Sequence, residues 1–334
     1  MNQQWTSFRN TFICSLVWLL VATAPYAYSE QTEAIPLISS PPQTPDTSPT
    51  GYDWWIEQHD NWTESFYDMV SSIDSFFAGD NYELLEHNSY LRLRLGARWE
   101  EDDGLSEDGD LKVRLDLPSM KQRWNLFIEN QLDERETLES TNREDDISPS
   151  SDDDSFYGGI SQEQDLEDWY LRPELGLRLR ASLDPFARLK ARRELDIDSA
   201  WHGQFQQSIY YFHSDGFGTR LQLLFSRPAG ERFLWQVKSE AQWQENTHNT
   251  DLAQIFTLKQ YLANRTTLTY ELGFLGETKP SLRSSEHYIN LRYRQPLYKD
   301  KLYLDVVPAV SWPRDEDFDP EFSITTRLEI LFSK

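Results

Sequence analysis

Regular alternation of apolar and charged residues, sustained over most of the chain, is the feature that most constrains its fold. In the segment 91–99 every odd position is apolar, while the even positions carry Arg92, Arg94 and Arg98. The segment 322–332 repeats this pattern near the C-terminus. Because successive side chains of a β-strand point to opposite faces, each such segment has one apolar and one charged face. The pattern predicts an all-β region.

Fourteen segments follow this pattern, and most have the ~9–11 residues that a tilted strand needs to cross a bilayer. We predict strands at 90–100, 109–117, 122–133, 154–163, 169–181, 185–195, 201–212, 217–226, 232–244, 252–262, 266–275, 286–295, 301–310 and 321–332. Nearly all long connections fall on one side of this sheet, which requires an even number of strands. Twelve strands are the alternative to fourteen, and 154–163 and 286–295 are the weakest segments.

The charges on the polar face distinguish a membrane barrel from a soluble β-sandwich, which also alternates and is the main alternative. That face carries full charges of both signs, as with Arg178 and Arg180 near Glu174. In a closed barrel these side chains point into the lumen and pair across strands, while the apolar face meets lipid. In hydrocarbon, unpaired backbone groups are costly, so strands cross only as a closed ring. We therefore predict a closed antiparallel transmembrane β-barrel over residues 89–334.

Residues 1–29 have the layout of a cleaved signal peptide. A polar start with Arg9 precedes an apolar run that is too short to span a bilayer as a helix, and the small-residue exit Ala27-Tyr28-Ser29 follows. An N-terminal membrane anchor is the alternative. Cys14, the one cysteine, would be removed with the signal, so we expect neither disulfides nor cysteine-ligated metals.

Two further segments precede the predicted barrel. Residues 30–50 are rich in Pro, Ser and Thr, which predicts a disordered linker. Within 51–88, apolar residues recur at steps of three, four and seven between 53 and 77, which predicts an amphipathic helix. This helix could lie in the inner-leaflet interface of the membrane, plug the barrel, or dock against a periplasmic partner.

The closing strand carries a resemblance to a known class of proteins. The segment 322–332, which ends on Phe332, resembles the C-terminal signal strand of Gram-negative outer-membrane β-barrel proteins. The stretches 211–218 and 310–317 are similar to those of an uncharacterised proteobacterial family of such barrels, and the likeness covers about residues 88–334. The resemblance implies a barrel in the cell outer membrane and recognition by the barrel assembly machinery. It implies no activity and no assigned site.

Basic residues are sorted onto strands of the first half, mostly on the predicted lumen faces, while acids dominate the connections. The basic residues are Arg92, Arg94, Arg98, Lys112, Arg114, Arg172, Arg178, Arg180, Arg188, Lys190 and Arg192. A basic inner wall would favour small anionic solutes in a pore. Alternatively, acids such as Glu129, Glu174 and Glu240 pair with these cations and fill the lumen of a structural or interaction barrel. Both interpretations stay open.

The formal net charge of −24 argues against a nucleic-acid partner. The acidic connection 134–153 is interpreted either as a solvated loop or as a surface that shares divalent cations with lipopolysaccharide phosphates, since its acids lack the spacing of a calcium-binding loop. Outer-membrane lipid and lipopolysaccharide are thus the expected partners. We expect no cofactor and no resident metal.

An outer-membrane hydrolase is the least favoured function. His287 lies near Ser284, Ser285 and Asn290, which is the only local cluster that allows a serine hydrolase on the wall. A barrel protease could likewise use His213 with Asp215, which follows it by two positions. We predict that neither group carries chemistry.

Overall fold

The structure is a computed structural model that describes residues 53–78, 89–101, 104–117, 124–129, 156–179, 183–197 and 200–333. The chain divides into two compact units, Met1–Ile56 and Glu57–Lys334. In the first unit only residues 53–56 are described, and they form the first turn of a helix. The predicted signal peptide (1–29) and linker (30–50) lie outside the described residues and stay predictions.

Helix α2 (Asp53–Ala78) lies where the apolar periodicity predicts a helix, at 53–77. Its buried positions from residue 57 onward include His59, Thr63, Phe66, Val70 and Asp74, at the three- and four-residue steps of one helical face. Among the described residues, no helix combines the length and the apolar character needed to cross a bilayer.

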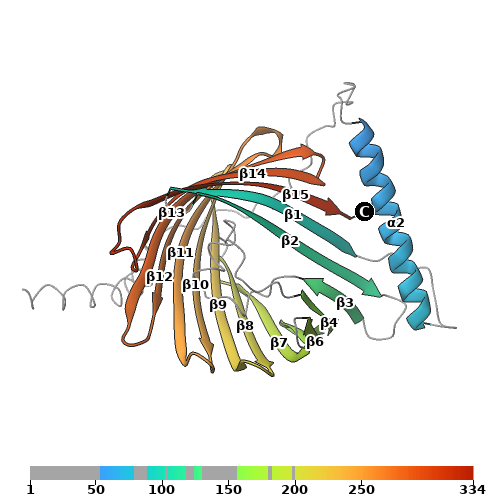
Figure 1. The fold of residues 1–334 in the computed structure, drawn as a ribbon, viewed down its shortest axis with the longest axis horizontal. Coiled ribbons are helices and arrows are strands. Elements are labelled where there is room, and N and C mark those ends of the chain that lie inside the picture. The colour runs from blue at the N-terminus through green and yellow to red at the C-terminus, as the bar shows by residue number, and fades with distance from the viewer. Residues whose placement is uncertain are drawn as a thin grey trace, which may run out of the picture. The chain divides into compact units, whose positions relative to one another are not determined.

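The strands form one antiparallel sheet that closes on itself (Figure 1). They are β1 (Tyr90–Glu100), β2 (Gly104–Leu117), β3 (Trp124–Glu129), β4 (Phe156–Gln162), β5 (Gln164–Leu166), β6 (Trp169–Leu179), β7 (Leu183–Asp196), β8 (His202–Phe212), β9 (Gly216–Ala229), β10 (Phe233–Gln244), β11 (Asn249–Tyr261), β12 (Thr267–Glu277), β13 (Arg283–Tyr298), β14 (Leu302–Pro313) and β15 (Glu321–Phe332). Apart from β4 and β5, which both pair with β6, neighbours in the chain are neighbours in the sheet, and β1 pairs with β15.

The short strand β5 continues β4, because both pair with β6 in one register that is interrupted at Gln162 and Glu163. Strands β4 and β5 therefore occupy one strand position, and the barrel has fourteen strand positions. This confirms the predicted closed antiparallel barrel of fourteen strands over the alternative of twelve. Closure also excludes an open two-layer sandwich, since each of the fourteen positions has a neighbouring strand on both sides.

Strand bounds follow the sequence pattern closely where the alternation is regular. β1 and β15 begin and end where predicted, and the two weakest segments are strands β4 and β13. β2 begins at Gly104 and not at 109, so most of the predicted connection 101–108 is strand. Its acidic residues do not prevent pairing, because ladder hydrogen bonds join backbone groups and not side chains.

The two faces of the barrel wall have opposite character. On β6, Glu174 and Arg178 are buried, while Leu175 and Leu177 are exposed. The same holds on β7, where Arg188 is buried and Leu189 is exposed. On these strands the buried charged residues point into the ring and the exposed leucines point out of it, which is the reverse of a soluble β-sandwich.

Inward-facing glycines of the wall are covered by aromatic rings from the adjacent strand. Gly176 lies opposite Phe186 in the ladder, Gly218 opposite Tyr210, and Gly273 opposite Tyr288. A Cβ atom added at any of these glycines would collide with the facing ring. Glycine is therefore required where a ring lies directly on the backbone of the wall.

Candidate functional site

The candidate site is the charged inner face of the barrel. The described members of the predicted basic set all lie on β1, β2, β6 and β7, and the ladder register places each of them on the same face as the buried acids. These residues are Arg92, Arg94, Arg98, Lys112, Arg114, Arg172, Arg178, Arg188, Lys190 and Arg192. Arg180 lies outside the described residues.

One part of this face is an ion-pair network across five adjacent strands, β2, β1, β15, β14 and β13. Arg92 Nη2 donates to Asp110 Oδ2 at 2.9 Å, and Arg94 Nε donates to Glu329 Oε2 at 2.7 Å. Glu329 also accepts a hydrogen bond from Arg294, whose Nη1 lies 3.0 Å from Asp305 Oδ2. We call this network the cationic wall: Arg92, Arg94 and Arg294 with Asp110, Glu329 and Asp305.

Exposure separates the cations of the cationic wall from its acids. The side chains of Arg92, Arg94 and Arg294 are 25%, 23% and 25% exposed, whereas those of Asp110, Glu329 and Asp305 are 9%, 4% and 1% exposed. The carboxylates thus lie beneath the guanidinium groups, which form the outermost layer of the wall. A solute beside this surface meets positive groups first, although the pairs balance in charge.

The same layering recurs around the ring. Lys112 covers Glu129 at 3.1 Å, and Arg172 covers the fully buried Glu174 at 2.7 Å. Arg327 lies opposite Asp305 in the ladder and, like Arg292, is on the inward face beside the cationic wall. Together with Arg292 and Arg327, this patch holds five arginines and three acids.

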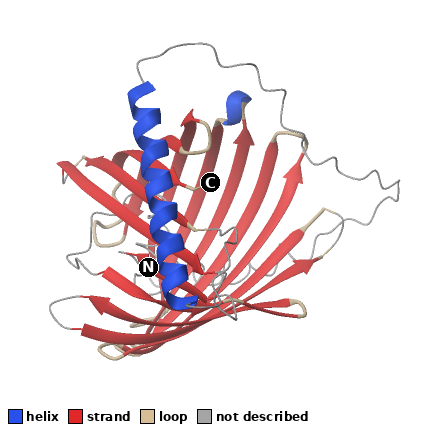
Figure 2. Cartoon of the chain, turned by 90° about the vertical axis from the view of Figure 1, so that its right-hand side faces the viewer, coloured by secondary structure: helices blue, strands red, loops and turns tan. Residues whose placement is uncertain are grey.

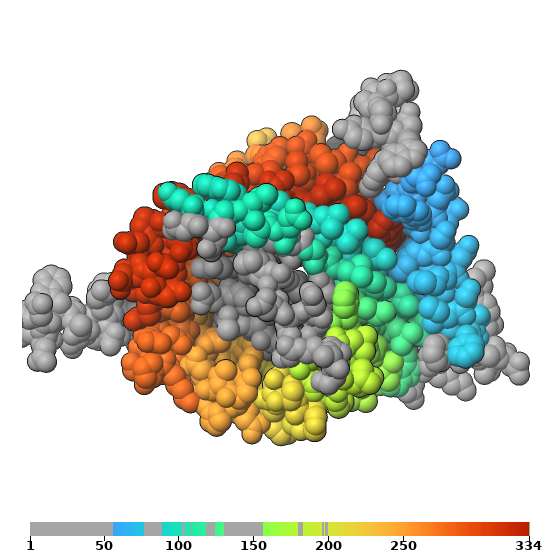
Figure 3. All heavy atoms as spheres, viewed as in Figure 1, coloured from blue at the N-terminus to red at the C-terminus, as the bar shows by residue number. Residues whose placement is uncertain are grey.

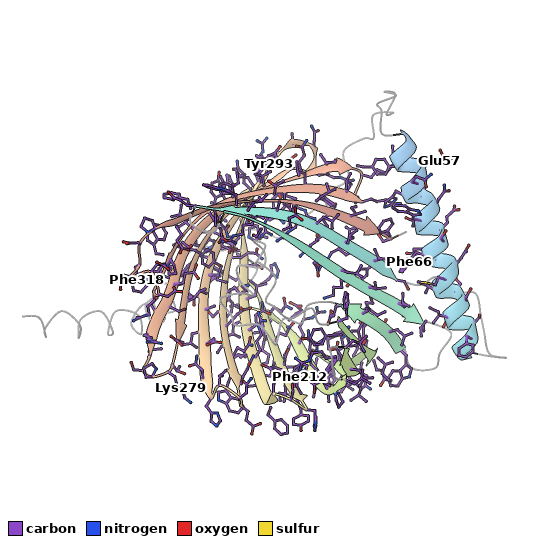
Figure 4. The ribbon with its side chains drawn as sticks, in the orientation of Figure 1. Glu57, Phe66, Phe212, Lys279, Tyr293 and Phe318 are labelled. Atoms are coloured by element: carbon purple, nitrogen blue, oxygen red, sulfur yellow. The ribbon has the colours of Figure 1, made fainter. Side chains whose placement is uncertain are left out.

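A second part of the inner face is filled by aromatic rings. Five buried side chains from β3, β4, β7 and β8 form the aromatic corner: Phe127, Tyr157, Phe186, Tyr210 and Phe212. The ring centroids of Phe186 and Phe212 are 5.3 Å apart (Phe212 is labelled in Figure 4).

Buried ion pairs accompany the aromatic corner. Arg188 pairs with Glu174 and also reaches Glu129, with Nη2 3.3 Å from Oε1. Glu129 is on β3 and Arg188 is on β7, with β4 and β6 between them in the sheet. The wall must therefore bend sharply for this contact to form. Arg188, Glu174 and Glu129 are all buried, unlike the arginines of the cationic wall.

The structure brings together only some of the residues considered for a hydrolase. Ser284 Oγ lies 3.3 Å from His287 Nε2 and donates to the carbonyl of Leu275 at 3.1 Å. His287 is on the outward face, between the rings of Phe274 and Phe318 at 5.3 and 5.7 Å. Asn290 is buried on the inward face, where its amide donates to Glu271 at 3.4 Å. The wall thus separates Asn290 from His287.

The remaining candidate groups lie elsewhere. The Asp215 carboxylate is 3.8 Å from Nη1 of Arg178, which also pairs with Asp184 at 2.6 Å. The acidic connection 134–153 lies outside the described residues. Within the part of the chain that the structure describes, no three His, Cys, Asp or Glu side chains are grouped so that they could hold a metal ion.

No family model matches the chain, and no curated protein matches it in sequence. Among solved structures, it is similar to the KdgM porin, with 8% identity, a TM-score of 0.34, and coverage of 72% of this chain and 98% of that one. It is also similar to outer-membrane expressed OmpT of Vibrio cholerae, with 9% identity, a TM-score of 0.45, and coverage of 75% and 100%. A third such structure is the NanC porin, with 8% identity, a TM-score of 0.36, and coverage of 72% and 98%.

The basic residues predicted to line the lumen all lie in the first half of the barrel and do not include Arg292, Arg294 and Arg327. These three lie in the predicted segments 286–295 and 321–332, and their even or odd positions already assign them to a face. Neighbouring tyrosines and arginines weaken the alternation around Arg292 and Arg294. The ladder pairing of β13 with β14 resolves their orientation.

Proposed function

We propose that this chain forms an outer-membrane pore that favours small anionic solutes. The membrane location is supported by the outward face, where large apolar side chains such as Leu95, Leu175 and Ile209 are exposed around a closed sheet. Such an extensive apolar surface is rare on a soluble monomer. A closed sheet also leaves no unpaired strand edge in hydrocarbon. The expected signal peptide and the resemblance of the closing strand favour the outer membrane of a Gram-negative cell.

The observation that carries the anion preference is the layering of the cationic wall. Arg92, Arg94 and Arg294 are partly exposed, and each covers a buried acid. Each of these arginines lies between the lumen and the acid with which it pairs. A permeating ion is therefore closer to the guanidinium than to the carboxylate, so the field of the guanidinium dominates at the ion. Fixed positive charge on a low-dielectric wall attracts anions and repels cations. No covalent chemistry is required for this function.

The aromatic corner favours the alternative of a structural barrel with a filled lumen, because its rings occupy one side of the inner face. Recording from the full chain in planar bilayers separates the two functions. A pore gives discrete conductance steps, and in a KCl gradient its reversal potential shows chloride to be more permeant than potassium. Absence of conductance from correctly folded barrels would favour the filled barrel. Conductance steps with a preference for potassium would support the proposed pore but contradict its proposed preference for anions.

Two substitutions in the cationic wall test its role with opposite signs. Arg94→Gln removes an exposed cation, while Glu329 keeps Arg294 as a partner, so we expect the chloride-to-potassium permeability ratio to fall. Glu329→Gln removes the buried acid, so we expect the ratio to rise. Each change in the ratio should be about fourfold, because one charge roughly 5 Å from an ion in screened water changes the population of chloride and of potassium about twofold each, in opposite directions.

Arg265→Gln is the matched control, because it removes the same charge from a turn outside the inner face and should leave the ratio unchanged. If Arg94→Gln and Arg265→Gln had equal effects, the cationic wall would not set the selectivity.

A further inference from the structure

Helix α2 packs on the outside of the barrel wall, at the end of the barrel where the last strand finishes (Figures 1 and 2). In Figure 3 its spheres lie directly against those of the first and last strands. Phe66, labelled in Figure 4, forms a buried cluster with Tyr67, Val70 and Leu115 of β2. Outward-facing residues of three strands pack against this cluster: Leu91, Val113 and Leu126. The helix thus covers part of the apolar outer surface of the barrel.

Specific polar contacts fix the rotation of α2 about its own axis. His59 Nε2 donates to the carbonyl of Leu331 at 2.9 Å, and the His59 ring stacks on Phe332 at 4.8 Å with 9° between the planes. About two turns further on, the Tyr67 hydroxyl donates to the carbonyl of Ser89 at 3.0 Å. Both contacts are buried on the helix side. Because α2 is held at two levels, its other faces have defined directions.

A line of large apolar residues runs beside the buried face of α2 without being covered by the barrel. Trp62, Met69 and Phe76 are 59%, 47% and 81% exposed. They are seven residues apart, which places them on one line with a drift of only ~20° per step. Three exposed apolar side chains in line indicate a surface that meets an apolar medium or a partner.

The direction of this line follows from the opposite flank of the helix. Asp60 lies about 160° around the helix from Trp62. Its carboxylate is 3.7 Å from Lys301 Nζ, in the turn between β13 and β14 beyond the strand ends. The acidic flank therefore points toward the tips of the strands, and the line of Trp62, Met69 and Phe76 points toward the middle of the barrel wall.

The apolar line is continuous with the outward surface of the barrel. The Trp62 ring lies 6.3 Å from that of Phe332, which is on the outward face of β15. Ile128 on β3 and Ile324 on β15 are further exposed apolar residues of the same outer surface. The apolar line of the helix therefore meets the apolar outer face of the barrel at Phe332.

We propose that α2 lies in the boundary between headgroups and acyl chains of the periplasmic leaflet and inserts Trp62, Met69 and Phe76 into the lipid. This inference rests on the proposed membrane location and assigns one of the three roles open to the helix. Because Asp60 and Glu64 face the water side, anionic headgroups do not attract the helix, and insertion depends on apolar burial alone. The contact is therefore independent of salt and of lipid charge.

Depth-dependent quenching in vesicles tests this placement on the full chain in a Cys14→Ser background. Single cysteines replace Met69 on the apolar line, Glu64 on the acidic flank, and Leu175 on the outward face of β6, and each carries an environment-sensitive fluorophore. The barrel is inserted into phosphatidylcholine vesicles with spin-labelled acyl chains, and aqueous iodide is the opposing quencher. We expect the Met69 label to be quenched by shallow acyl-chain spin labels and shielded from iodide, and the Glu64 label to show the reverse.

The Leu175 label distinguishes the two levels of the proposal. If lipid quenches neither Leu175 nor Met69, the membrane location fails, and the role of α2 fails with it. If lipid quenches Leu175 while iodide reaches Met69 as readily as Glu64, only the role of α2 is overturned. A Met69 label shielded from iodide but untouched by lipid quenchers would also overturn it, since a protein would then cover the helix.

Discussion

The cationic wall and the aromatic corner use the same kind of ion pair in opposite ways. In the aromatic corner Arg188 and Glu174 are both buried, so the charge of each is neutralised by the other. In the cationic wall the acid is buried while the arginine stays partly exposed. Pairing alone therefore does not decide whether an inner wall presents charge to a solute. The depth of each partner decides it.

Backbone geometry accounts for the difference between the two regions. In the aromatic corner the inward positions of β4 and β6 include Gly159 and Gly176, which leave room for the rings of Phe127 and Phe186. These rings displace solvent and let the wall bend until Arg188 reaches Glu129. In the cationic wall arginines occupy such positions, and their flexible stems keep the charged ends at the surface.

The largest expected effect comes from breaking a pair in the aromatic corner. Glu174→Gln leaves the buried Arg188 and its neighbour Arg172 with less compensation, because Glu174 accepts a hydrogen bond from Arg188 and forms an ion pair with Arg172. We expect a loss of about 3 kcal/mol in the free energy of unfolding, as is typical when one partner of a buried pair is removed. The measurement is a urea titration of the folded barrel, followed by its heat-modifiable mobility on gels.

Glu329→Gln provides the comparison in the cationic wall. Its partners Arg94 and Arg294 are partly exposed and are hydrated when the carboxylate is lost, so about 1 kcal/mol or less is expected. Equal losses for Glu174→Gln and Glu329→Gln would contradict the distinction between a filled and a solvent-facing region.

An intermediate effect is expected where the wall of the aromatic corner bends. Gly159→Ala puts a Cβ atom against the carbonyl of Leu175 and 2.8 Å from Gly176 Cα, and backbone atoms cannot move aside without distorting the ladder. We expect a loss of ~1–3 kcal/mol in the same titration. Gly158→Ala is the control on the adjacent residue, since its Cβ atom would meet nothing closer than 3.9 Å. A loss as large for Gly158→Ala would mean that strand flexibility, and not the close approach, explains the glycines.

How far the sequence predicts these two regions depends on the distance over which the contacts act. Period-two alternation is local, so it locates β1 and β15 to the residue and assigns Arg92 and Arg94 to the inner face. The contact between Glu129 and Arg188 is not local, because it requires the pairing of β4 with β6 and the bend of the wall. Nothing near either residue in the chain encodes that contact.

The alternation within a single segment also does not predict how deeply the acids and the cations of the inner face are buried. The sequence shows that Glu129 and Glu174 share faces with cations, and so left open whether the acids cancel the basic wall. Ring closure sets which atoms lie against the backbone and which reach the surface. On β2 the alternation of apolar and charged residues does not extend to the start of the strand. Glu107 lies within β2, although the residues around it have the composition of a loop.

The smallest effect is expected for an ion pair outside the inner face, between Arg265 in the turn after β11 and Asp300 in the turn after β13. Both side chains are exposed, and Arg265 Nη1 donates to both carboxylate oxygens of Asp300 at 2.5 and 2.6 Å. These hydrogen bonds raise the pKa of the Arg265 guanidinium above its ordinary value. A raised pKa of a cation adds stability below the unfolded pKa, and this is lost only as pH rises through the folded one.

Between about pH 5 and pH 9 the contribution of Arg265 is therefore constant, and hydration and salt screen it. We expect Asp300→Asn to leave the urea midpoint unchanged at physiological salt, at either end of that range. This result would give the reference value for the stability that an ion pair contributes in the two inner regions. The pair of Arg265 with Asp300 joins a guanidinium to a carboxylate, as the pair of Arg94 with Glu329 does, but it lies outside the barrel lumen. If Asp300→Asn shifted the midpoint as far as Glu329→Gln, enclosure would contribute nothing to the cationic wall, and the layering of its charges would have no energetic basis.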